Sequence, residues 1–504
     1  MASGRLRVAV IGAGAAGLCS ARHILSRPLT FEPPVVLEMT EQVGGTWVYT
    51  EEVESGAHIH SSMYRDLSTN LPKEIMEFPD FAFDPSLPSF IHHSEVLKYL
   101  EDYTDRFSIR PHIKFNTRVV SVTPVLGEGK NSEVSWDVTS QTQDNGDPVT
   151  ERFDAIMVCA GHYSHPFLPD IEGLEQFQGQ VLHSKYYRYP EVFSFHSVVV
   201  LGAGPSGLDI SLELSPHAKH VSLSHQGSPL QWTPPANLSF VPPVVRATHN
   251  SLICEDGTEI MADTLIFCTG YKYTYPFLLT GSNMMENQKI DQRDKMKRKN
   301  LDELIELESG KGFKKNEENP QVNETLTVKS VLPRVDLLED EDIVGTNGEQ
   351  GHLPPLYKHL FHARYPTLGF IGAVKFVIPF SLFHCQAQFF LSVLGGKFQL
   401  PPPEEMLSES REEVLKTQNS GIPLKYLHRL GKNYWEYMQG LADTAGFEPL
   451  APVLCKIFQA CWNFKNIEPT LYRRLNFKLL NREEYEMKGE VPLPFLNAFK
   501  KSLP

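Results

Sequence analysis

The residues of this chain with the most specific chemistry are glycines in turns of the type GxGxxG. The first turn follows the apolar run "VAVI" and has glycines at positions 12, 14 and 17. The first glycine of such a turn permits the tight bend, the second lets the backbone approach a pyrophosphate, and the third lets helix and strand pack closely. The following helix presents unpaired N–H groups to the phosphates. The residues predicted to form this phosphate site are Gly12, Ala13, Gly14, Ala15, Ala16 and Gly17.

An acidic residue follows the first turn at the spacing that a dinucleotide site requires. Glu38 lies 21 residues beyond Gly17 and ends the strand-like segment "PVVLE". A carboxylate at this place accepts hydrogen bonds from both ribose hydroxyls. The first turn therefore predicts a site that fits the adenosine ribose of FAD.

A second turn of the same type begins 190 residues later, in "VVVLGAGPSGLDI". The next strand ends in "SLSHQG", with Ser222, Ser224 and His225 where the first unit has its acid. The missing carboxylate removes repulsion against a 2′-phosphate, which favours NADPH over NADH. The alternative interpretation is that the two serines simply finish a strand. The residues predicted for this second phosphate site are Gly202, Ala203, Gly204, Pro205, Ser206 and Gly207.

Two further stretches could contribute to a flavin pocket. "EQVGGTWVY" offers adjacent glycines for close backbone approach and, in Trp47, a flat apolar surface. Asn70 lies in a Thr-Asn-Leu-Pro loop, and its amide can donate and accept hydrogen bonds without titrating. Taken alone, each stretch is equally compatible with an ordinary turn.

The elements that must position these residues follow from hydrophobic periodicity. We predict a strand over residues 6–11, a helix over 15–25, and an amphipathic helix over 94–107 that is capped by Ser94. "DTLIFCTGY" parallels "DAIMVCAGHY", so both halves of the chain end in a similar buried strand. The pattern indicates an α/β chain with two βαβ nucleotide-binding units, and a return of the chain to the first unit after Tyr271.

Composition excludes several classes of protein. The 504 residues carry a net charge of −14, which argues against a nucleic-acid partner. None of the seven cysteines forms a CxxC pair, which is typical of reduced thiols and excludes the redox pair of a flavin disulfide reductase. No uninterrupted apolar run reaches about 18 residues, so we predict no transmembrane anchor. These features predict a cytoplasmic protein without a metal site.

Together, these motifs resemble the flavin-containing monooxygenases, the N- and S-oxygenating branch of the class B flavoprotein monooxygenases. The similarity rests on both glycine turns and on "GGTW", "YRDLSTNLPKEIMEFPDF", "FQGQVLHSKYY", "FCTGYKYTYPFL" and "PLYKHLF". The stretch "FQGQVLHSKYY" fits the family signature FxGxxxHxxxY, with His183 and Tyr187 at the last two fixed positions.

The resemblance implies a fold and a domain order. The fold would be α/β with two Rossmann-like dinucleotide-binding domains, the NADP domain inserted within the FAD domain. We expect the first part of the FAD-binding domain over residues 1–164 and the NADPH-binding domain over 165–280. A charged, flexible insertion over 281–351 and a return to the FAD domain with a C-terminal helical region over 352–504 would follow.

The resemblance also implies the reaction and the cofactors. NADPH would reduce FAD, and O₂ would form a C4a-hydroperoxyflavin that oxygenates a small amine or sulfide, as in N-oxide formation by the N,N-dimethylaniline monooxygenase type in xenobiotic metabolism. The protein would position and shield the flavin, which explains why no nucleophile–base pair is needed. A homodimer is compatible with this reading.

The site residues carried over from the resemblance lie in four segments. Asn70, the expected catalytic residue, would hydrogen-bond near flavin C4a, with Thr69 beside it. His183 would lie where the domains meet, and Gln386 would approach the flavin from the returning segment. The remaining expected contacts are Glu38 at the FAD ribose, Gly45, Thr46 and Trp47 at the isoalloxazine, and Ser206, Gly207 and Asp209 at the NADP pyrophosphate.

The chain departs from the family pattern in several places. His384 stands where many relatives have glutamate, His225 replaces the usual arginine for the 2′-phosphate, the insertion is long, and the C-terminal anchor of microsomal members is absent. Baeyer–Villiger oxidation of ketones is a second reading, disfavoured by Tyr187, where that branch has Trp or Pro. A third is a protein without oxygenase activity, either an NADPH oxidase or a scaffold that uses the charged insertion.

Overall fold

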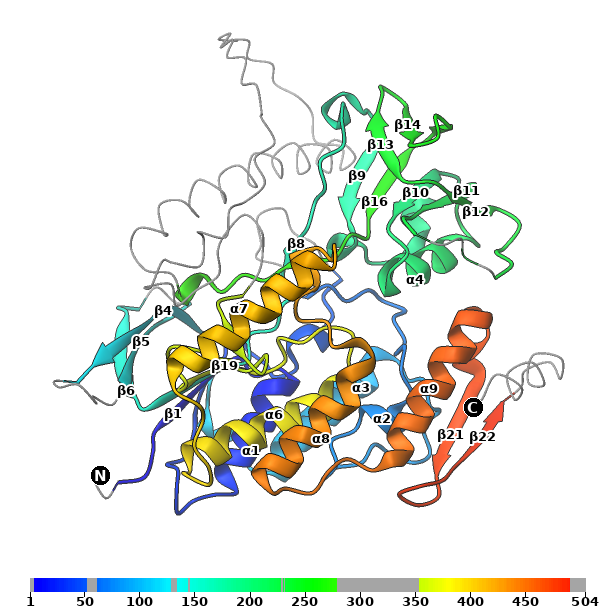
Figure 1. Cartoon of the computed structure of the whole chain (residues 1–504). Helices are drawn as coiled ribbons and strands as arrows, with labels where there is room; N and C mark the ends of the chain where they lie inside the picture. The colour runs from blue at the N-terminus through cyan, green and yellow to red at the C-terminus, as the bar shows by residue number, and fades with distance from the viewer. Residues whose placement is uncertain are drawn as a thin grey trace, which may run out of the picture.

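Two sheets with parallel central strands organise the molecule (Figure 1). In each sheet, one of the two glycine turns follows a central strand. The computed structural model describes residues 4–51, 61–127, 134–143, 146–227, 230, 232–278 and 353–489. The sheet that contains the first turn is called the first unit below, and the sheet that contains the second turn is called the second unit.

The first unit is a seven-stranded sheet built from both ends of the chain. Its order is β18-β19-β20-β7-β1-β2-β3, and the strands from β20 to β3 are parallel. Strand β20 comes from the C-terminal part of the chain and pairs with β7, Leu368 opposite Ile156, so the chain does return to the first unit. The strands are β1 (Val8–Ile11), β2 (Val35–Leu37), β3 (Ile113–Lys114), β7 (Ala155–Val158), β18 (Leu356–Tyr357), β19 (Phe361–His362) and β20 (Leu368–Phe370).

The second unit is a five-stranded parallel sheet of order β12-β11-β10-β16-β9. Both of its central strands, β10 and β16, have near-continuous apolar sequences, because a parallel sheet is covered on both faces. The signature stretch "FQGQVLHSKYY" supplies the edge strand β9. The elements are β9 (Gln180–His183), β10 (Ser197–Leu201), α4 (Pro205–Leu214), β11 (His220–Ser224), β12 (Leu238–Val241) and β16 (Thr264–Phe267).

The helices of the first unit bury their apolar faces in one core. Helix α1 packs against α6, which the returning chain supplies, and against α3. The apolar core around them includes aromatic side chains such as Phe78, Tyr103 and Phe380, which pack ring against ring. The helices are α1 (Ala15–Leu25), α2 (Lys73–Met76), α3 (His93–Arg106), α6 (Pro379–Leu394), α7 (Pro403–Asn419), α8 (Tyr434–Ala445) and α9 (Pro452–Ile467).

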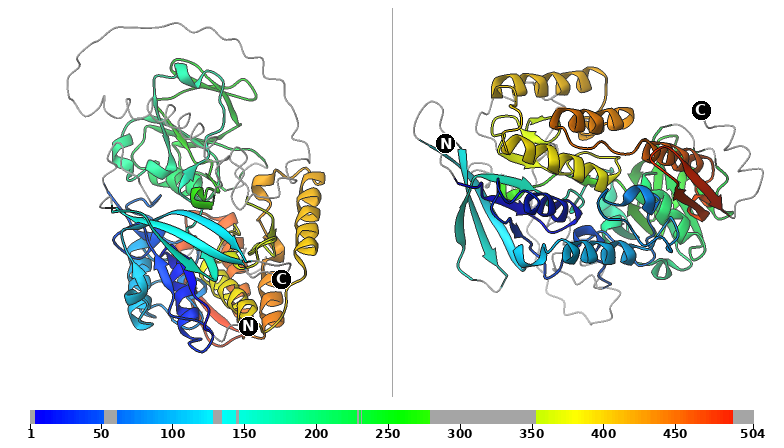
Figure 2. Two further views of the ribbon diagram at one scale, coloured as in Figure 1. Left: turned by 90° about the vertical axis from the view of Figure 1, so that its left-hand side faces the viewer. Right: turned by 90° about the horizontal axis from the view of Figure 1, so that it is seen from below.

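Smaller antiparallel pieces complete the described part of the chain. The two passages between the units lie side by side, because β8 pairs with β17. The hairpin β21–β22 follows α9, and β21 contacts α2 of the first unit (Figure 2). The strands are β4 (Thr117–Leu126), β5 (Val134–Thr142), β6 (Val149–Phe153), β8 (His165–Pro166), β13 (Val244–Ala247), β14 (Ser251–Cys254), β15 (Glu259–Met261), β17 (Tyr271–Lys272), β21 (Leu475–Leu479) and β22 (Tyr485–Gly489).

The fold confirms most of the predicted elements and corrects one helix end. The prediction of a helix over 15–25 matches α1. Helix α3 begins at His93, and its cap is His92, whose side chain accepts from the Ser94 N–H. The prediction of Ser94 as the cap was therefore wrong. The insertion predicted over 281–351 lies outside the described residues.

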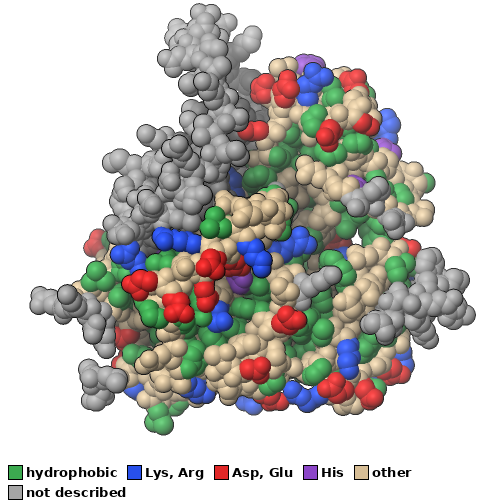
Figure 3. Space-filling model, in the orientation of Figure 1, with side chains coloured by type: hydrophobic (Ala, Val, Ile, Leu, Met, Phe, Trp, Pro, Cys, Tyr) green, Lys and Arg blue, Asp and Glu red, His purple; other side chains and the backbone are tan. Residues whose placement is uncertain are grey.

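Side chains of both charge signs lie on the surface. On the described part of the face in Figure 3, acidic side chains lie close to basic ones. No helix among the described residues is both long and apolar enough to cross a bilayer.

Candidate functional site

The first glycine turn has the backbone geometry that only glycine permits. Gly12 has φ +103°, and a Cβ there would lie 2.8 Å from the carbonyl oxygen of Cys159 at the end of β7. A Cβ on Gly17 would lie 1.8 Å from the carbonyl oxygen of Gly12. Gly14 precedes α1 without a side-chain cap, so no side chain covers the first amides of α1. The turn thus presents a helix N-terminus to an anion.

Glu38 lies beside this turn at the end of β2. The side chain is buried, and its Oε2 accepts a hydrogen bond of 2.7 Å from the Ala13 N–H. Its Oε1 accepts from the N–H and the hydroxyl of Thr40, both at 2.8 Å. The carboxylate therefore fixes the turn and stands where the ribose of a bound nucleotide is expected.

The "GGTW" segment packs backbone against backbone on the first turn. The Gly44 N–H donates to the Ala13 carbonyl at 3.1 Å. A Cβ on Gly45, which has φ +56°, would lie 3.0 Å from the Cα of Gly14. Thr46 is exposed, and the half-buried Trp47 ring meets Phe380 edge to face. Glycine at both positions allows this close approach of the two backbones, because a side chain would separate them.

The second turn repeats the geometry of the first. Gly202 has φ +110°, and a Cβ there would lie 2.6 Å from the Cys268 carbonyl oxygen. A Cβ on Gly207 would lie 1.7 Å from the Gly202 carbonyl oxygen. Gly204 precedes α4 without a side-chain cap and has open space around it. The next two residues, Pro205 and Ser206, are exposed, so this turn is also accessible to an anion.

The polar residues after β11 divide into two kinds. Ser222 and Ser224 are buried, and the Ser224 hydroxyl donates to the Pro242 carbonyl at 2.9 Å and accepts from the Val244 N–H at 3.0 Å. For these serines the interpretation as strand-ending residues is the better one. His225 is half-buried at the end of the strand and is the one of the three that faces partly outward.

Thr69 and Asn70 lie on a loop that other segments hold in place. The Thr69 N–H donates to the Ile91 carbonyl at 2.8 Å, and its hydroxyl accepts from the Ile91 N–H at 3.1 Å. The carbonyls of Ser68 and Thr69 accept from Arg473. Asn70 is half-buried, and its amide makes no hydrogen bond to another described residue. The backbone of the loop is fixed and the Asn70 amide is available, while its predicted contact with the flavin stays a prediction.

His183 is used as a structural connector between strand β9 and a passage between the units. Its Nδ1 accepts from the Lys185 N–H at 3.1 Å, and its Nε2 lies 3.1 Å from the Gly270 carbonyl. Burial lowers the pKa of His183 to about 4, so the ring is neutral. Both ring nitrogens are thus engaged with the backbone, which gives His183 a positioning role and leaves no nitrogen available as a base.

Tyr187 belongs to the core of the second unit. Its hydroxyl donates to Glu213 at 2.8 Å, and its ring packs on Phe193 and Tyr64. Burial raises the pKa of Glu213 to about 7, because water solvates this carboxylate poorly. The hydrogen bond from Tyr187 partly offsets this by stabilising the charged form. The Tyr187 hydroxyl is therefore engaged within the protein.

Gln386 is fully buried in α6, and both ends of its amide are occupied. Its Oε1 accepts from the Gly372 N–H at 2.8 Å, and its Nε2 donates to the Tyr437 hydroxyl at 2.9 Å. The side chain thereby fixes the loop that joins β20 to α6. Its approach to the flavin stays a prediction.

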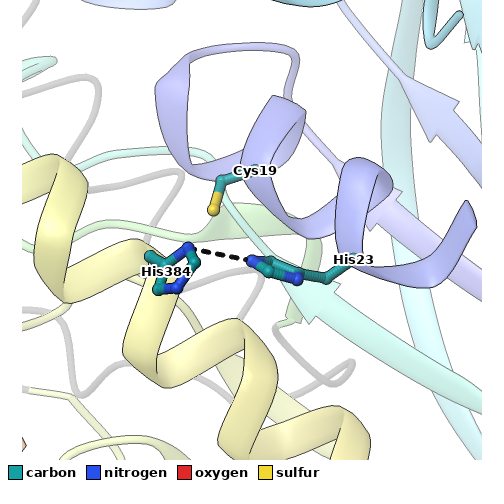
Figure 4. Close-up of side chains that lie close together, drawn as sticks. All are labelled: Cys19, His23 and His384. Atoms are coloured by element: carbon teal, nitrogen blue, oxygen red, sulfur yellow. Dashed lines mark hydrogen bonds between the residues drawn. The ribbon is translucent and has the colours of Figure 1, made fainter. Parts of the chain in front are cut away.

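His384 forms a polar cluster between α1 and α6 that the sequence did not reveal. Its Nδ1 lies 3.2 Å from Nε2 of His23, and its Nε2 lies 2.8 Å from the amide nitrogen of Gln388. Cys19 completes a group whose ligand-type atoms lie within 4.8 Å of one another (Figure 4). Burial lowers the pKa of both histidines, that of His384 to about 4. The contacts describe two neutral rings that hydrogen-bond across a helix pair.

The sequence also gave no signal for Arg473 and Asp209 as partners. Arg473 Nη1 and Asp209 Oδ1 are 2.5 Å apart, although 264 residues separate them in the chain. Neither residue of this pair lies at a spacing that a periodic pattern detects. Only the tertiary position of the turn Tyr472–Arg474 relative to α4 brings them together.

Known proteins resemble this chain in both sequence and fold. A family model described as "Flavin-binding monooxygenase-like" matches residues 5–232. The flavin-containing monooxygenase FMO GS-OX4 of Arabidopsis thaliana is 34% identical over 462 residues, which cover 87% of this chain and 84% of the relative.

Two solved structures extend the similarity to the whole architecture. The S-allyl-L-cysteine S-oxygenase from Allium sativum is 26% identical with a TM-score of 0.74, covering 99% of each chain. Tmm from Pelagibacter sp. strain HTCC7211 is 26% identical with a TM-score of 0.69, covering 93% of each chain. With two phosphate-binding turns on two Rossmann-type sheets, the chain belongs to the flavin-containing monooxygenase family, which uses FAD and NADPH.

Proposed function

We propose that this chain is an NADPH- and O₂-dependent monooxygenase that transfers oxygen to soft nucleophiles, sulfide sulfur or amine nitrogen. The observation that carries the proposal is the pairing of two anion-accepting turns in one chain, with a ribose-binding acid beside the first turn only. The names of two relatives, S-allyl-L-cysteine S-oxygenase and FMO GS-OX4, favour sulfides as the first substrate class to test.

In this proposal the residues of the chain bind, orient and shield. The N-terminus of α1 and Glu38 hold the FAD pyrophosphate and ribose, and the N-terminus of α4 holds the NADP pyrophosphate. Bound FAD supplies the activation of O₂, which no side chain provides. Asn70, whose amide has no partner among the described residues, is offered to the reacting face of the flavin. Asn70 suits this role because an amide neither titrates nor attacks.

We propose that the protein is cytoplasmic, and its cysteines support this compartment. All seven are free thiols. Burial raises the pKa of Cys159, Cys268, Cys385 and Cys461 to about 12, which makes these thiols unreactive. Unpaired structural cysteines are typical of a reducing environment.

The test measures NADPH consumption, product and hydrogen peroxide with purified protein and FAD. We expect S-allyl-L-cysteine or N,N-dimethylaniline to yield about one sulfoxide or N-oxide per NADPH, since oxygen transfer and cofactor oxidation are coupled in a shielded site. Peroxide without product would replace the proposal by the oxidase reading. Lactone formed from cyclohexanone at a higher rate than sulfoxide would replace it by the Baeyer–Villiger reading.

A further inference from the structure

One arginine from the C-terminal part of the chain connects the two units. Arg473 lies in the short turn Tyr472–Arg474 between α9 and β21, and its side chain reaches Asp209 of α4. Its Nε donates to the Thr69 carbonyl at 3.0 Å, and its Nη2 donates to the Ser68 carbonyl at 3.1 Å. Its Nη1 bonds to Asp209 of the second unit. All three nitrogens of the guanidinium are therefore engaged, two in one unit and one in the other.

Asp209 receives this contact on the helix that follows the second turn. It lies in the second turn of α4, and its other oxygen, Oδ2, accepts from the hydroxyl of Tyr64, whose ring packs in the core of the second unit. The Asp209 side chain is 20% exposed, and that of Arg473 is 28% exposed. A charge-assisted pair in such a partly buried place is stronger and more directional than a pair on the open surface.

This hydrogen-bond network ends near the Asn70 loop on one side and near the second glycine turn on the other. In the proposed function, these two parts of the site face each other. Asn70 follows directly on the carbonyls that Arg473 holds, and Asp209 lies two residues beyond Gly207 of the second turn. Arginine suits this place because its rigid, planar fork supplies several donors in fixed directions, which lysine does not. Tyr64 strengthens the same contact, since its ring packs on Tyr187, which in turn bonds to Glu213 of α4.

We propose that Arg473 is a positioning residue that fixes the Asn70 loop relative to the N-terminus of α4, and thereby sets the orientation in which NADPH reduces FAD. The proposal rests on the proposed function for the role of Asn70 alone. Its test uses only the two cofactors. Because a misplacement of about 1 Å between reacting groups costs on the order of a hundredfold in rate, loss of this contact slows reduction without emptying either cofactor site.

The decisive measurement is the anaerobic reduction of bound FAD by saturating NADPH, followed by flavin absorbance. We expect Arg473→Met to reduce FAD about ten- to a hundredfold more slowly than the wild type, with FAD content unchanged. Arg473→Lys should recover part of the rate because it keeps the charge. The matched control is Arg474→Met, since Arg474 is the exposed neighbour in the same turn and should stay within about twofold.

A second variant and a second readout keep the test decisive. Asp209→Asn keeps the shape and removes the charge, and it should slow reduction as Arg473→Met does. In thermal unfolding of the cofactor-free chain, the double variant should lose less stability than the sum of the two single variants, because they break one contact. Reduction within about twofold of the wild type in both Arg473→Met and Asp209→Asn would overturn the proposal, and a loss of stability alone would leave Arg473 a purely structural residue.

Failure of the proposed function is recognised separately. A wild-type protein that reduces FAD with NADPH but forms no sulfoxide or N-oxide contradicts the oxygenase proposal, while the reduction rates of the variants still decide the role of Arg473.

Discussion

At the scale of single residues, the predicted site contains two kinds of polar side chain. Some have all their polar atoms hydrogen-bonded within the protein, and others have no partner there. Glu38, His183 and Gln386 have their polar atoms engaged by neighbouring backbone or side chains. The amide of Asn70 has no hydrogen-bond partner among the described residues, and the same holds for the hydroxyls of Thr46 and Ser206. The Asn70 amide is only half-buried, so water can satisfy it until a ligand takes its place. The role predicted for Asn70 needs such an available amide.

Asn70→Asp tests this interpretation. The carboxylate keeps the size of the side chain but loses both N–H donors, so we expect FAD to remain bound while product per NADPH falls at least about tenfold, the cost of one charged or buried hydrogen bond. Product is measured against hydrogen peroxide in the same reaction. Asn250→Asp, at an exposed turn in the second unit, is the matched control and should behave as the wild type. Equal coupling in the wild type and Asn70→Asp would contradict the role of Asn70.

At the scale of elements, each strand–turn–helix segment contains glycines at positions where a side chain would clash. The third glycine of each turn is the most constrained, because a Cβ on Gly17 or Gly207 would penetrate the carbonyl oxygen of the first glycine. The helix cannot move away without losing its packing on the sheet. Phosphate binding and folding of the unit therefore share the same requirement.

Gly17→Ala and Gly440→Ala should have opposite effects on stability. Gly17→Ala places a methyl group 1.8 Å from a backbone oxygen, so we expect loss of FAD binding and several degrees lower melting temperature. Gly440 lies in α8 with open space around it, and alanine there should stabilise by about 0.5–1 kcal/mol because it is the better helix former. Thermal unfolding with and without FAD measures both. A Gly17→Ala protein with normal FAD content would show that the model of the turn is wrong.

At the scale of the whole molecule, many titratable side chains are buried in their neutral form. Burial is the main cause that lowers the pKa of several histidines to between about 3 and about 4. They are His93, His162, His183, His359 and His384. Burial also raises the pKa of Glu77, Glu213 and Glu413 to about 7. These two groups of residues have opposite effects on stability as the pH falls.

Acidification should destabilise the protein between about pH 6.5 and pH 4. In that window the unfolded chain binds protons on the histidines and the folded chain does not, so their contribution to stability, complete above the unfolded pKa, is lost as the pH falls. The three carboxyls oppose this, because the folded chain binds their protons first, but the histidines outnumber them. Each unmatched proton changes the free energy of unfolding by about 1.4 kcal/mol per pH unit.

The measurement is the melting temperature from pH 7.5 to pH 5. His162→Gln removes one buried histidine and should make the dependence on pH shallower, while His249→Asn, at an exposed turn, should leave it as in the wild type. A melting temperature that rises on acidification would show that the carboxyls dominate.

Local pattern determined a large part of this protein. Glycine spacing, the apolar strands and the position of Glu38 predicted both turns, helix α1, the FAD and NADP units and the family, because each of these depends on residues close together in the chain. The end of α3 was misjudged because an imidazole at His92 occupies the place of the expected serine cap. Sequence rules rank residue types by how often they cap helices. They do not show which side chain lies close enough to the first N–H groups of the helix.

Tertiary structure decided which groups meet across long separations. Arg473 and Thr69 are 404 residues apart in the chain, and His23 and His384 are 361 apart, so no periodicity connects them. It also turned Ser224 inward and occupied Gln386, because a buried polar atom must find a partner wherever packing places it. The sequence therefore predicted what each unit binds, while the packing of the returning chain decided how distant segments are held together.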